Sequence, residues 1–191
     1  PVLRDIHWRW SGEIIEPLDG VANLGREPGS KRTFVISGDS GNGITHATIG
    51  ASIVCSQIQG ISLPWEKVYD PARSQARHLP ELLKEQAEIA SQYTDWLSAG
   101  DAPDVGGIGF DNGAVIRHGL SKIAVYRDTH GDLFAHSATC PHMGCVVQWN
   151  LAERTWDCPC HGSRFSAYGA LLHGPAPHGL SSLNSPPACD A

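Results

Sequence analysis

The sequence Cys140-Pro-His-Met-Gly-Cys145 is followed, after a short intervening segment, by Cys158-Pro-Cys-His-Gly-Ser163. Each arm offers a thiolate and an imidazole in Cys-x-His or Cys-x-x-His spacing. The residues between the arms are expected to form a hairpin that brings them together. Thiolates and imidazoles gathered in this way predict a metal centre.

Three kinds of site compete for these side chains. A zinc finger takes two cysteines from one element and two histidines from another at wider spacing, and a Cys-x-His pair is tight for one tetrahedral ion. A purely structural pair of disulfides would leave both histidines unexplained. Two sulfide-bridged irons fit better, because one iron takes a thiolate from each arm and the other takes both imidazoles. We favour the two-iron centre, with zinc and the disulfides as alternatives.

The two arms resemble those of the Rieske family, in the form found in cytochrome bc complexes. The resemblance also rests on the later Gly174-Pro-Ala-Pro177 and covers about residues 105–191. It implies a 2Fe-2S cluster whose metal ligands are Cys140, His142, Cys158 and His161. It further implies a disulfide between Cys145 and Cys160.

Other residues are expected around the cluster by the same resemblance. They are Gly144, Gly162, Ser163, Phe165, Pro175 and Pro177. Ser163 is expected to donate a hydrogen bond to a bridging sulfide, and the proline-rich loop to close the third side of the cluster. Phe165 stands where high-potential family members carry a tyrosine, so the hydroxyl that would bond a ligating sulfur is absent.

Short strand-like segments separated by glycine and proline turns predict a small all-β domain from about residue 105 onward. The segments are Lys122–Arg127, Leu133–Ala138, Val146–Trp149, Thr155–Cys158 and Ala170–Leu172.

The front third of the chain predicts a strand, a glycine loop and a helix. The strand is expected over Lys31–Ser37, the loop over Gly38–Gly43, and the helix over Ile44–Gln59, ending at Gly60. Free backbone N–H groups and the positive end of a helix dipole meet at such a loop and attract a phosphate or the pyrimidine edge of a flavin. Cys55, within the helix, is expected to be a small buried hydrophobe.

This region resembles the C-terminal portion of a D-amino-acid-oxidase-type flavoenzyme. The resemblance rests on Arg9-Trp-Ser-Gly12, the glycine loop followed by Ile44-Thr45-His46, and Tyr69-Asp-Pro-Ala-Arg73, with Ala22 where the family often has proline. It implies FAD as a cofactor of a longer parent protein. The residues expected to face the flavin are Gly41, Asn42, Gly43, Ile44 and Thr45. The GxGxxG segment that holds the dinucleotide in that family is missing from this sequence.

An acidic connector is expected between these two regions. Apolar residues at helical spacing from Leu79 to Leu97 predict an amphipathic helix, which Pro80 starts and Gly100 stops. The chain is therefore expected to be α+β. Its parts would be residues 1–73 from an FAD-dependent oxidoreductase domain, residues 74–104 as the connector, and residues 105–191 as the Rieske domain.

Composition excludes several classes of partner. The formal net charge is −6 and no basic cluster exceeds the pair Lys31-Arg32, which argues against nucleic acid. The sequence contains no run of 18 apolar residues, so no membrane-spanning segment is expected. The chain begins at Pro1 with neither an initiator Met nor a signal peptide, so we expect a piece of a longer, cytoplasmic protein.

The preferred functional hypothesis is an electron-transfer module. A flavin handles two electrons and the cluster one, so the pair would divide a two-electron oxidation into single steps. The partners would be the flavin domain of the parent chain and an unidentified electron donor or acceptor. In this hypothesis the parent is the enzyme and the fragment alone is an electron carrier. The alternative is a regulatory module that senses redox state and gates an amine or amino-acid oxidase.

Overall fold

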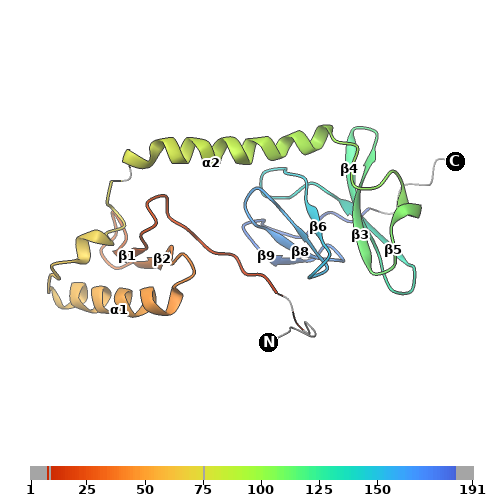
Figure 1. The fold of residues 1–191 in the computed structure, drawn as a ribbon. Coiled ribbons are helices and arrows are strands. Elements are labelled where there is room, and N and C mark those ends of the chain that lie inside the picture. The colour runs from red at the N-terminus through yellow and green to blue at the C-terminus, as the bar shows by residue number, and fades with distance from the viewer. Residues whose placement is uncertain (1–7, 9, 75, 184–191) are drawn as a thin grey trace, which may run out of the picture. The chain divides into compact units, whose positions relative to one another are not determined.

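The computed structural model describes residues 8, 10–74 and 76–183, and the chain divides into two compact units (Figure 1). One unit comprises Gly12–Gln86. The other combines the chain from Ala87 onward with the residues before Gly12. Arg9, one residue of the flavoenzyme-like motifs, lies outside the described residues.

The Gly12–Gln86 unit is a two-stranded antiparallel sheet with a helix against it. Strands β1 (Asn23–Arg26) and β2 (Phe34–Ser37) pair directly, and helix α1 spans Gly43–Gln59. The helix ends where the sequence predicted, because Gly60 adopts the left-handed conformation (φ 71°) that stops a helix. Among the described residues, the buried core of this unit consists of three side chains, those of Ala22, Leu24 and Ile53.

The other unit contains two antiparallel sheets, which confirms the expected β-rich architecture with few helices. The first sheet has the order β3-β4-β5, with strands at Asn112–His118, Ser121–Arg127 and Leu133–Ser137. The second has the order β6-β7-β8-β9, with strands at Gln148–Asn150, Thr155–Asp157, Arg164–Ser166 and Leu171–His173. The cores of this unit are much larger than that of Gly12–Gln86 and include the fully buried Trp156 and Phe165.

Strands β3 and β8 were not expected from the sequence. Strand β3 carries the buried run Ala114–Ile116, but Gly113 precedes that run, and Arg117 and His118 follow it. Strand β8 has only three residues and directly follows the second cysteine–histidine arm. Its pairing with β7 and β9 decides its conformation, and such pairing is tertiary information.

The connector begins as helix α2 (Leu79–Ser91) and continues as a tighter 3-10 helix over Gln92–Leu97. The expected helix is therefore present, although its last turn is wound differently. None of the helices in the described part of the chain is long and apolar enough to cross a membrane.

The expectation for Cys55 was wrong, because its side chain is exposed. Within α1 only Gly50 and Ile53 are buried. Cys55 lies two positions from Ile53, which on a helix is about half a turn away from the side that contacts the sheet.

Candidate metal centre

The first cysteine–histidine arm forms a tight loop between β5 and β6. The backbone N–H of Cys140 donates to the carbonyl of Cys145 (2.8 Å), and the N–H of Gly144 donates to the carbonyl of Cys140 (3.0 Å). Gly144 takes a φ of 81°, which favours glycine because it has no Cβ. These two hydrogen bonds close the loop, and Cys140 takes part in both of them.

The second arm repeats this backbone pattern between β7 and β8. The N–H of Cys158 donates to the carbonyl of Ser163 (2.8 Å), and the N–H of Gly162 donates to the carbonyl of Cys158 (3.0 Å). Gly162 has a φ of 76°. We call the segments Cys140–Cys145 and Cys158–Ser163 the first and second cluster loops.

A disulfide between Cys145 and Cys160 joins the two loops, as the resemblance implied. Both cysteines are buried. The disulfide leaves Cys140 and Cys158 as buried free thiols, one at the base of each loop.

The Cys140 thiol lies close enough to Cys158 to affect the ionisation of the Cys158 thiol. Burial, and secondarily the neighbouring Cys140, raises the pKa of the Cys158 thiol to about 11. The sulfur of Cys158 is also within 4.8 Å of both disulfide sulfurs, but sulfurs bonded to each other are not available as thiolate ligands. Two buried thiolates side by side need a cation, so this pair fits a metal ion that stabilises the deprotonated form.

The histidine rings of the two loops lie next to each other. The rings of His142 and His161 have centroids 4.7 Å apart and are perpendicular. The Nδ1 atoms of both rings are buried and have no hydrogen-bond partner among the described residues. Burial, followed by the neighbouring His142, lowers the pKa of His161. Buried polar atoms are rarely left without partners, so two neighbouring imidazoles with unpartnered Nδ1 atoms fit metal ligands.

The proline-rich loop contacts the second cluster loop. Ser163 is fully buried, and its Oγ accepts a hydrogen bond from the backbone N–H of Ala176 (2.9 Å). Ala176 is buried, whereas Pro175 and Pro177 on either side are exposed. The hydroxyl hydrogen of Ser163 is not used in this contact, because Oγ acts here as the acceptor.

Phe165 lies in the same buried core as Cys140 and Cys158. It is fully buried on β8, where it pairs across the sheet with Trp156. Its ring therefore packs in the core that also contains these two cysteines.

Residues 98–184 match the family model described as the Rieske [2Fe-2S] domain. The chain belongs to the Rieske family. Residues 98–184 thus form a Rieske iron–sulfur electron-transfer domain, and the cofactor of the domain is the 2Fe-2S cluster.

Three curated relatives are similar to the chain. The Rieske 2Fe-2S iron–sulfur protein YhfW of Bacillus subtilis is 29% identical over 179 residues, which cover 91% of this chain and 35% of that protein. A cytochrome b6-f complex iron–sulfur subunit of Synechococcus is 29% identical over 177 residues, covering 87% of each chain. That of Parasynechococcus marenigrum is 33% identical over 128 residues, covering 65% of this chain and 67% of the subunit. The chain therefore spans about a third of the length of the Bacillus protein.

Sequence reasoning missed two residues that contact the first cluster loop of the Rieske domain. Tyr93 and Trp96, in the connector, donate hydrogen bonds to the carbonyls of Met143 and Gly144. Their helical spacing predicted a face that packs on a neighbour, but nothing in the sequence identified the neighbour.

The five residues expected to face a flavin lie together at the N-terminal end of α1. Gly41, Asn42, Gly43, Ile44 and Thr45 are all exposed. The loop before them is shaped by Asp39, whose Oδ1 accepts from the N–H of Gly41 (2.8 Å).

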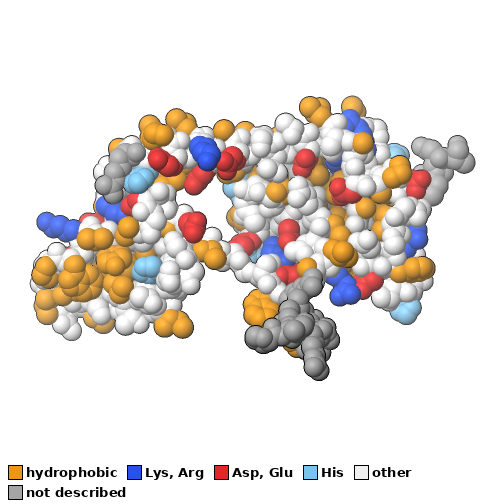
Figure 2. Space-filling view, viewed as in Figure 1, with side chains coloured by type: hydrophobic (Ala, Val, Ile, Leu, Met, Phe, Trp, Pro, Cys, Tyr) orange, Lys and Arg blue, Asp and Glu red, His pale blue; other side chains and the backbone are white. Residues whose placement is uncertain are grey.

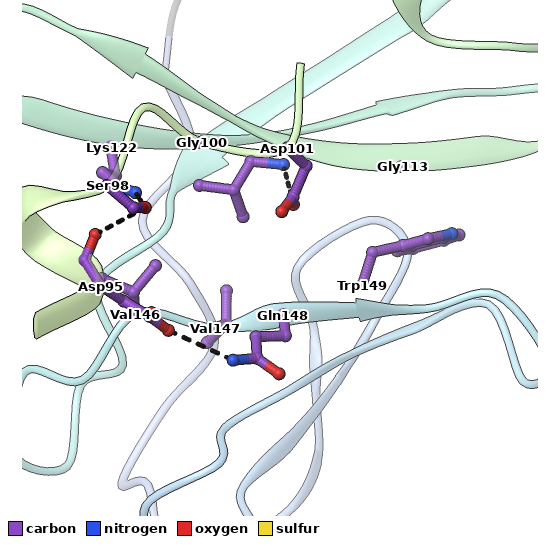
Figure 3. Close-up of a pocket in the computed structure, with 11 residues that line it drawn as sticks. Asp95, Ser98, Gly100, Asp101, Gly113, Lys122, Val146, Val147, Gln148 and Trp149 are labelled. Atoms are coloured by element: carbon purple, nitrogen blue, oxygen red, sulfur yellow. Dashed lines mark hydrogen bonds between the residues drawn. The ribbon is translucent and has the colours of Figure 1, made fainter. Parts of the chain in front are cut away.

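A pocket of about 400 Å³ lies in the same unit as the Rieske loops but is not the metal centre (Figure 3). It lies between the connector, β3, β4 and β6, and its walls include Asp95, Lys122 and Gln148. None of the four expected ligands lines it.

Proposed function

We propose that this Rieske domain holds its cluster with the thiolates of Cys140 and Cys158 on one iron and with Nδ1 of His142 and His161 on the other. We further propose that it passes single electrons between a flavin in a longer parent protein and an external partner. The first proposal is supported above all by two histidine rings whose centroids lie 4.7 Å apart and whose Nδ1 atoms are buried and unpartnered among the described residues, in loops that also carry two buried free thiols.

The surrounding residues have separate tasks in this proposal. The disulfide holds the two loops together, and the buried cysteines keep water from the sulfur side of the site. Ser163 donates its hydroxyl hydrogen toward the cluster while the N–H of Ala176 fixes its oxygen. When bound, the cluster accepts and releases one electron at a time.

Metal analysis of the purified chain tests the ligand assignment. We expect two irons and two labile sulfides per chain, a red-brown colour, and the anisotropic, low-average-g signal of a histidine-ligated cluster after reduction. His161→Ala should abolish this signal. His130→Ala is the matched control, because His130 lies exposed in the turn between β4 and β5. Stoichiometric zinc without iron would overturn the proposal.

The flavin part of the proposal is supported by the surface of α1. The helix contains no charged residue, and its exposed side carries Ile44, Ala47, Ala51, Cys55 and Ile58. Figure 2 shows hydrophobic side chains gathered over this helix. Exposed apolar residues gathered on a surface commonly mark a place where another part of the protein packs. The unit therefore has the surface expected of one part of a larger flavin-binding domain.

The Bacillus relative supports a longer parent. Its similarity extends over 91% of this chain, well beyond the Rieske domain, yet accounts for only 35% of its own length. The Gly12–Gln86 unit thus has a counterpart in a protein that is much longer than this chain.

The native gene product decides whether a flavin is present. We expect its reading frame to encode a GxGxxG strand–turn–helix before Pro1, and the purified product to contain FAD together with iron. A product without FAD would contradict the flavin part and leave the ligand assignment untouched.

Stopped-flow spectroscopy of the same product separates electron transfer from the regulatory alternative. With an amine or amino-acid substrate, transfer predicts that the cluster absorbance bleaches on the timescale of flavin turnover. A cluster spectrum that stays unchanged through many turnovers would instead favour a redox sensor that gates the oxidase.

A further inference from the structure

The last part of the connector packs on the first cluster loop. Ile89, Tyr93 and Trp96 follow one another at spacings of four and three residues, so they share one side of the helix. All three pack against the core that contains Cys140 and Cys145. The connector is therefore part of the surroundings of the metal centre.

Two side chains of the connector bond the backbone just after a proposed ligand. Tyr93 Oη donates to the carbonyl of Met143 (2.7 Å), and Trp96 Nε1 donates to the carbonyl of Gly144 (3.0 Å). Met143 and Gly144 directly follow His142 in the chain. We call Tyr93 and Trp96 the connector clamp.

The clamp completes the hydrogen bonding of one peptide group. In the peptide that links Met143 to Gly144, the carbonyl accepts from Tyr93 and the N–H donates to the carbonyl of Cys140. A peptide group bonded at both ends cannot rotate without losing both bonds. The position of His142, one residue earlier, depends on this orientation.

The connector is itself fixed to both sheets. Arg117 on β3 donates to the carbonyl of Ser98 (3.0 Å), and Lys122 on β4 bonds the Oγ of Ser98. From β6, the side chain of Gln148 donates to the carboxylate of Asp95 (3.2 Å). Figure 3 shows the contacts of Lys122 and Gln148 with the connector, along the pocket. The segment that carries the clamp is therefore hydrogen-bonded to strands of both sheets.

We propose that Tyr93 and Trp96 are positioning residues of the metal centre: they hold the first cluster loop so that the His142 ring keeps one orientation toward the irons. The proposal rests on the ligand assignment given above. The second cluster loop is held differently, through the bond from Ala176 to Ser163. Loss of the clamp should therefore loosen the His142 side of the site selectively.

The variant Trp96→Phe tests the proposal, because phenylalanine keeps a ring and removes the N–H donor. Trp149→Phe is the matched control. Trp149 packs against the same core, but its Nε1 is buried without a hydrogen-bond partner in the described part of the chain. The two variants remove the same atoms, and only the first removes a hydrogen bond to the cluster loop.

We expect Trp96→Phe to lose iron about 2- to 10-fold faster than the parent chain, the factor that corresponds to one net hydrogen bond. The reduced cluster should also show broader paramagnetic resonance lines, because the orientation of His142 becomes less uniform. Tyr93→Phe should act in the same direction, and the double variant should exceed either single one. Trp149→Phe should leave the linewidths unchanged.

The outcomes separate this inference from the function on which it rests. If the parent chain binds no iron–sulfur cluster, the ligand assignment fails. If the parent chain binds the cluster and Trp96→Phe shows the linewidths and iron-loss rate of Trp149→Phe, only the positioning role is wrong. A lower unfolding temperature in Trp96→Phe with unchanged linewidths would also contradict positioning, because it would reflect packing alone.

Discussion

The two units of the chain are stabilised in different ways. The Rieske unit has extensive buried cores, two sheets and a disulfide. Among its described residues, the Gly12–Gln86 unit has a core of three buried apolar side chains and a single pair of strands. An isolated two-stranded sheet is marginally stable in water, so this unit must depend on other interactions.

Arg73 supplies much of that support in the Gly12–Gln86 unit. Its guanidinium forms two bonds with the carboxylate of Asp19 (2.6 and 2.8 Å) and one with the side chain of Asn23 (2.8 Å). It also bonds the carbonyls of Val21 and Ala22. The side chains of Arg73 and Asp19 are only 13% and 5% exposed, so the pair is largely withdrawn from water. A polar network around Arg73 thus stabilises the fold of this unit, whereas large apolar cores stabilise the fold of the other unit.

The largest expected effect is that of Arg73→Ala. Removing one partner of a buried ion pair typically destabilises a protein by about 3–5 kcal/mol, because the remaining charge stays buried without compensation. We expect hydrogen exchange to increase throughout Gly12–Gln86 while the iron–sulfur absorbance is retained. Arg32→Ala, at an exposed position of the same unit, is the control. Equal exchange in the two variants would show that the network is dispensable.

The double variant Cys145→Ser, Cys160→Ser should weaken the other unit. Its cysteines are 15 residues apart, and a disulfide closing a loop of that size stabilises by about 3 kcal/mol. We expect earlier unfolding of the Rieske unit and a shorter cluster lifetime, measured by absorbance during heating. Cys55→Ser, an exposed single thiol in the other unit, should change neither. A double variant with the same unfolding temperature and cluster lifetime as the parent chain would contradict a structural role of the disulfide.

Acid should act on the Gly12–Gln86 unit through Asp19. The hydrogen bond from Arg73 is the main cause that lowers the pKa of this carboxyl from 3.8 to about 2. Because the folded pKa is the lower one, the stabilisation is complete above pH 4 and disappears as the pH falls toward 2. Amide signals of α1, followed by NMR, should therefore weaken in this window. Asp19→Asn should remove this pH dependence, and a parallel acid response in that variant would assign it to other groups.

The smallest expected effect concerns the potential of the Rieske centre. Hydrogen bonds to cluster sulfurs favour the reduced, more negative state, so Phe165→Tyr should raise the midpoint potential. A differential bond of ~1 kcal/mol corresponds to ~40 mV for one electron. Ser163→Ala should lower the potential by a similar or larger amount. Protein-film voltammetry measures both shifts. An unmoved potential in Phe165→Tyr with an intact cluster would mean that Phe165 does not occupy the tyrosine position of the family.

Much of the Rieske unit could be predicted from local sequence. The spacing of cysteine and histidine in residues 140–163 indicated a metal centre, and the strands β4, β5, β7 and β9 lie within or beside the predicted segments. The bounds of α1 followed from a glycine loop at one end and Gly60 at the other. Such features depend on residues that are neighbours in the chain, so the sequence contains the whole signal.

Contacts between distant segments could not be predicted in this way. Asp19 and Arg73 are 54 residues apart, and Trp96 is 48 residues from Gly144. No periodicity connects either pair. The exposure of Cys55 was predicted wrongly for a related reason, because the apolar composition of α1 does not reveal which side of the helix the hairpin covers.

The sequence by itself determined the chemistry of the metal centre, the order of its two loops and the apolar character of α1. Ligand type, glycine positions and helix composition are properties of individual residues and their immediate neighbours. Only the tertiary structure decided that the two loops share one pattern of backbone hydrogen bonds. It also decided that their neighbours differ, because the connector clamp contacts the first loop and Ala176 contacts the second. The reason is that a hydrogen bond depends on distance and direction in space, and the folded chain sets these for groups that the sequence keeps far apart.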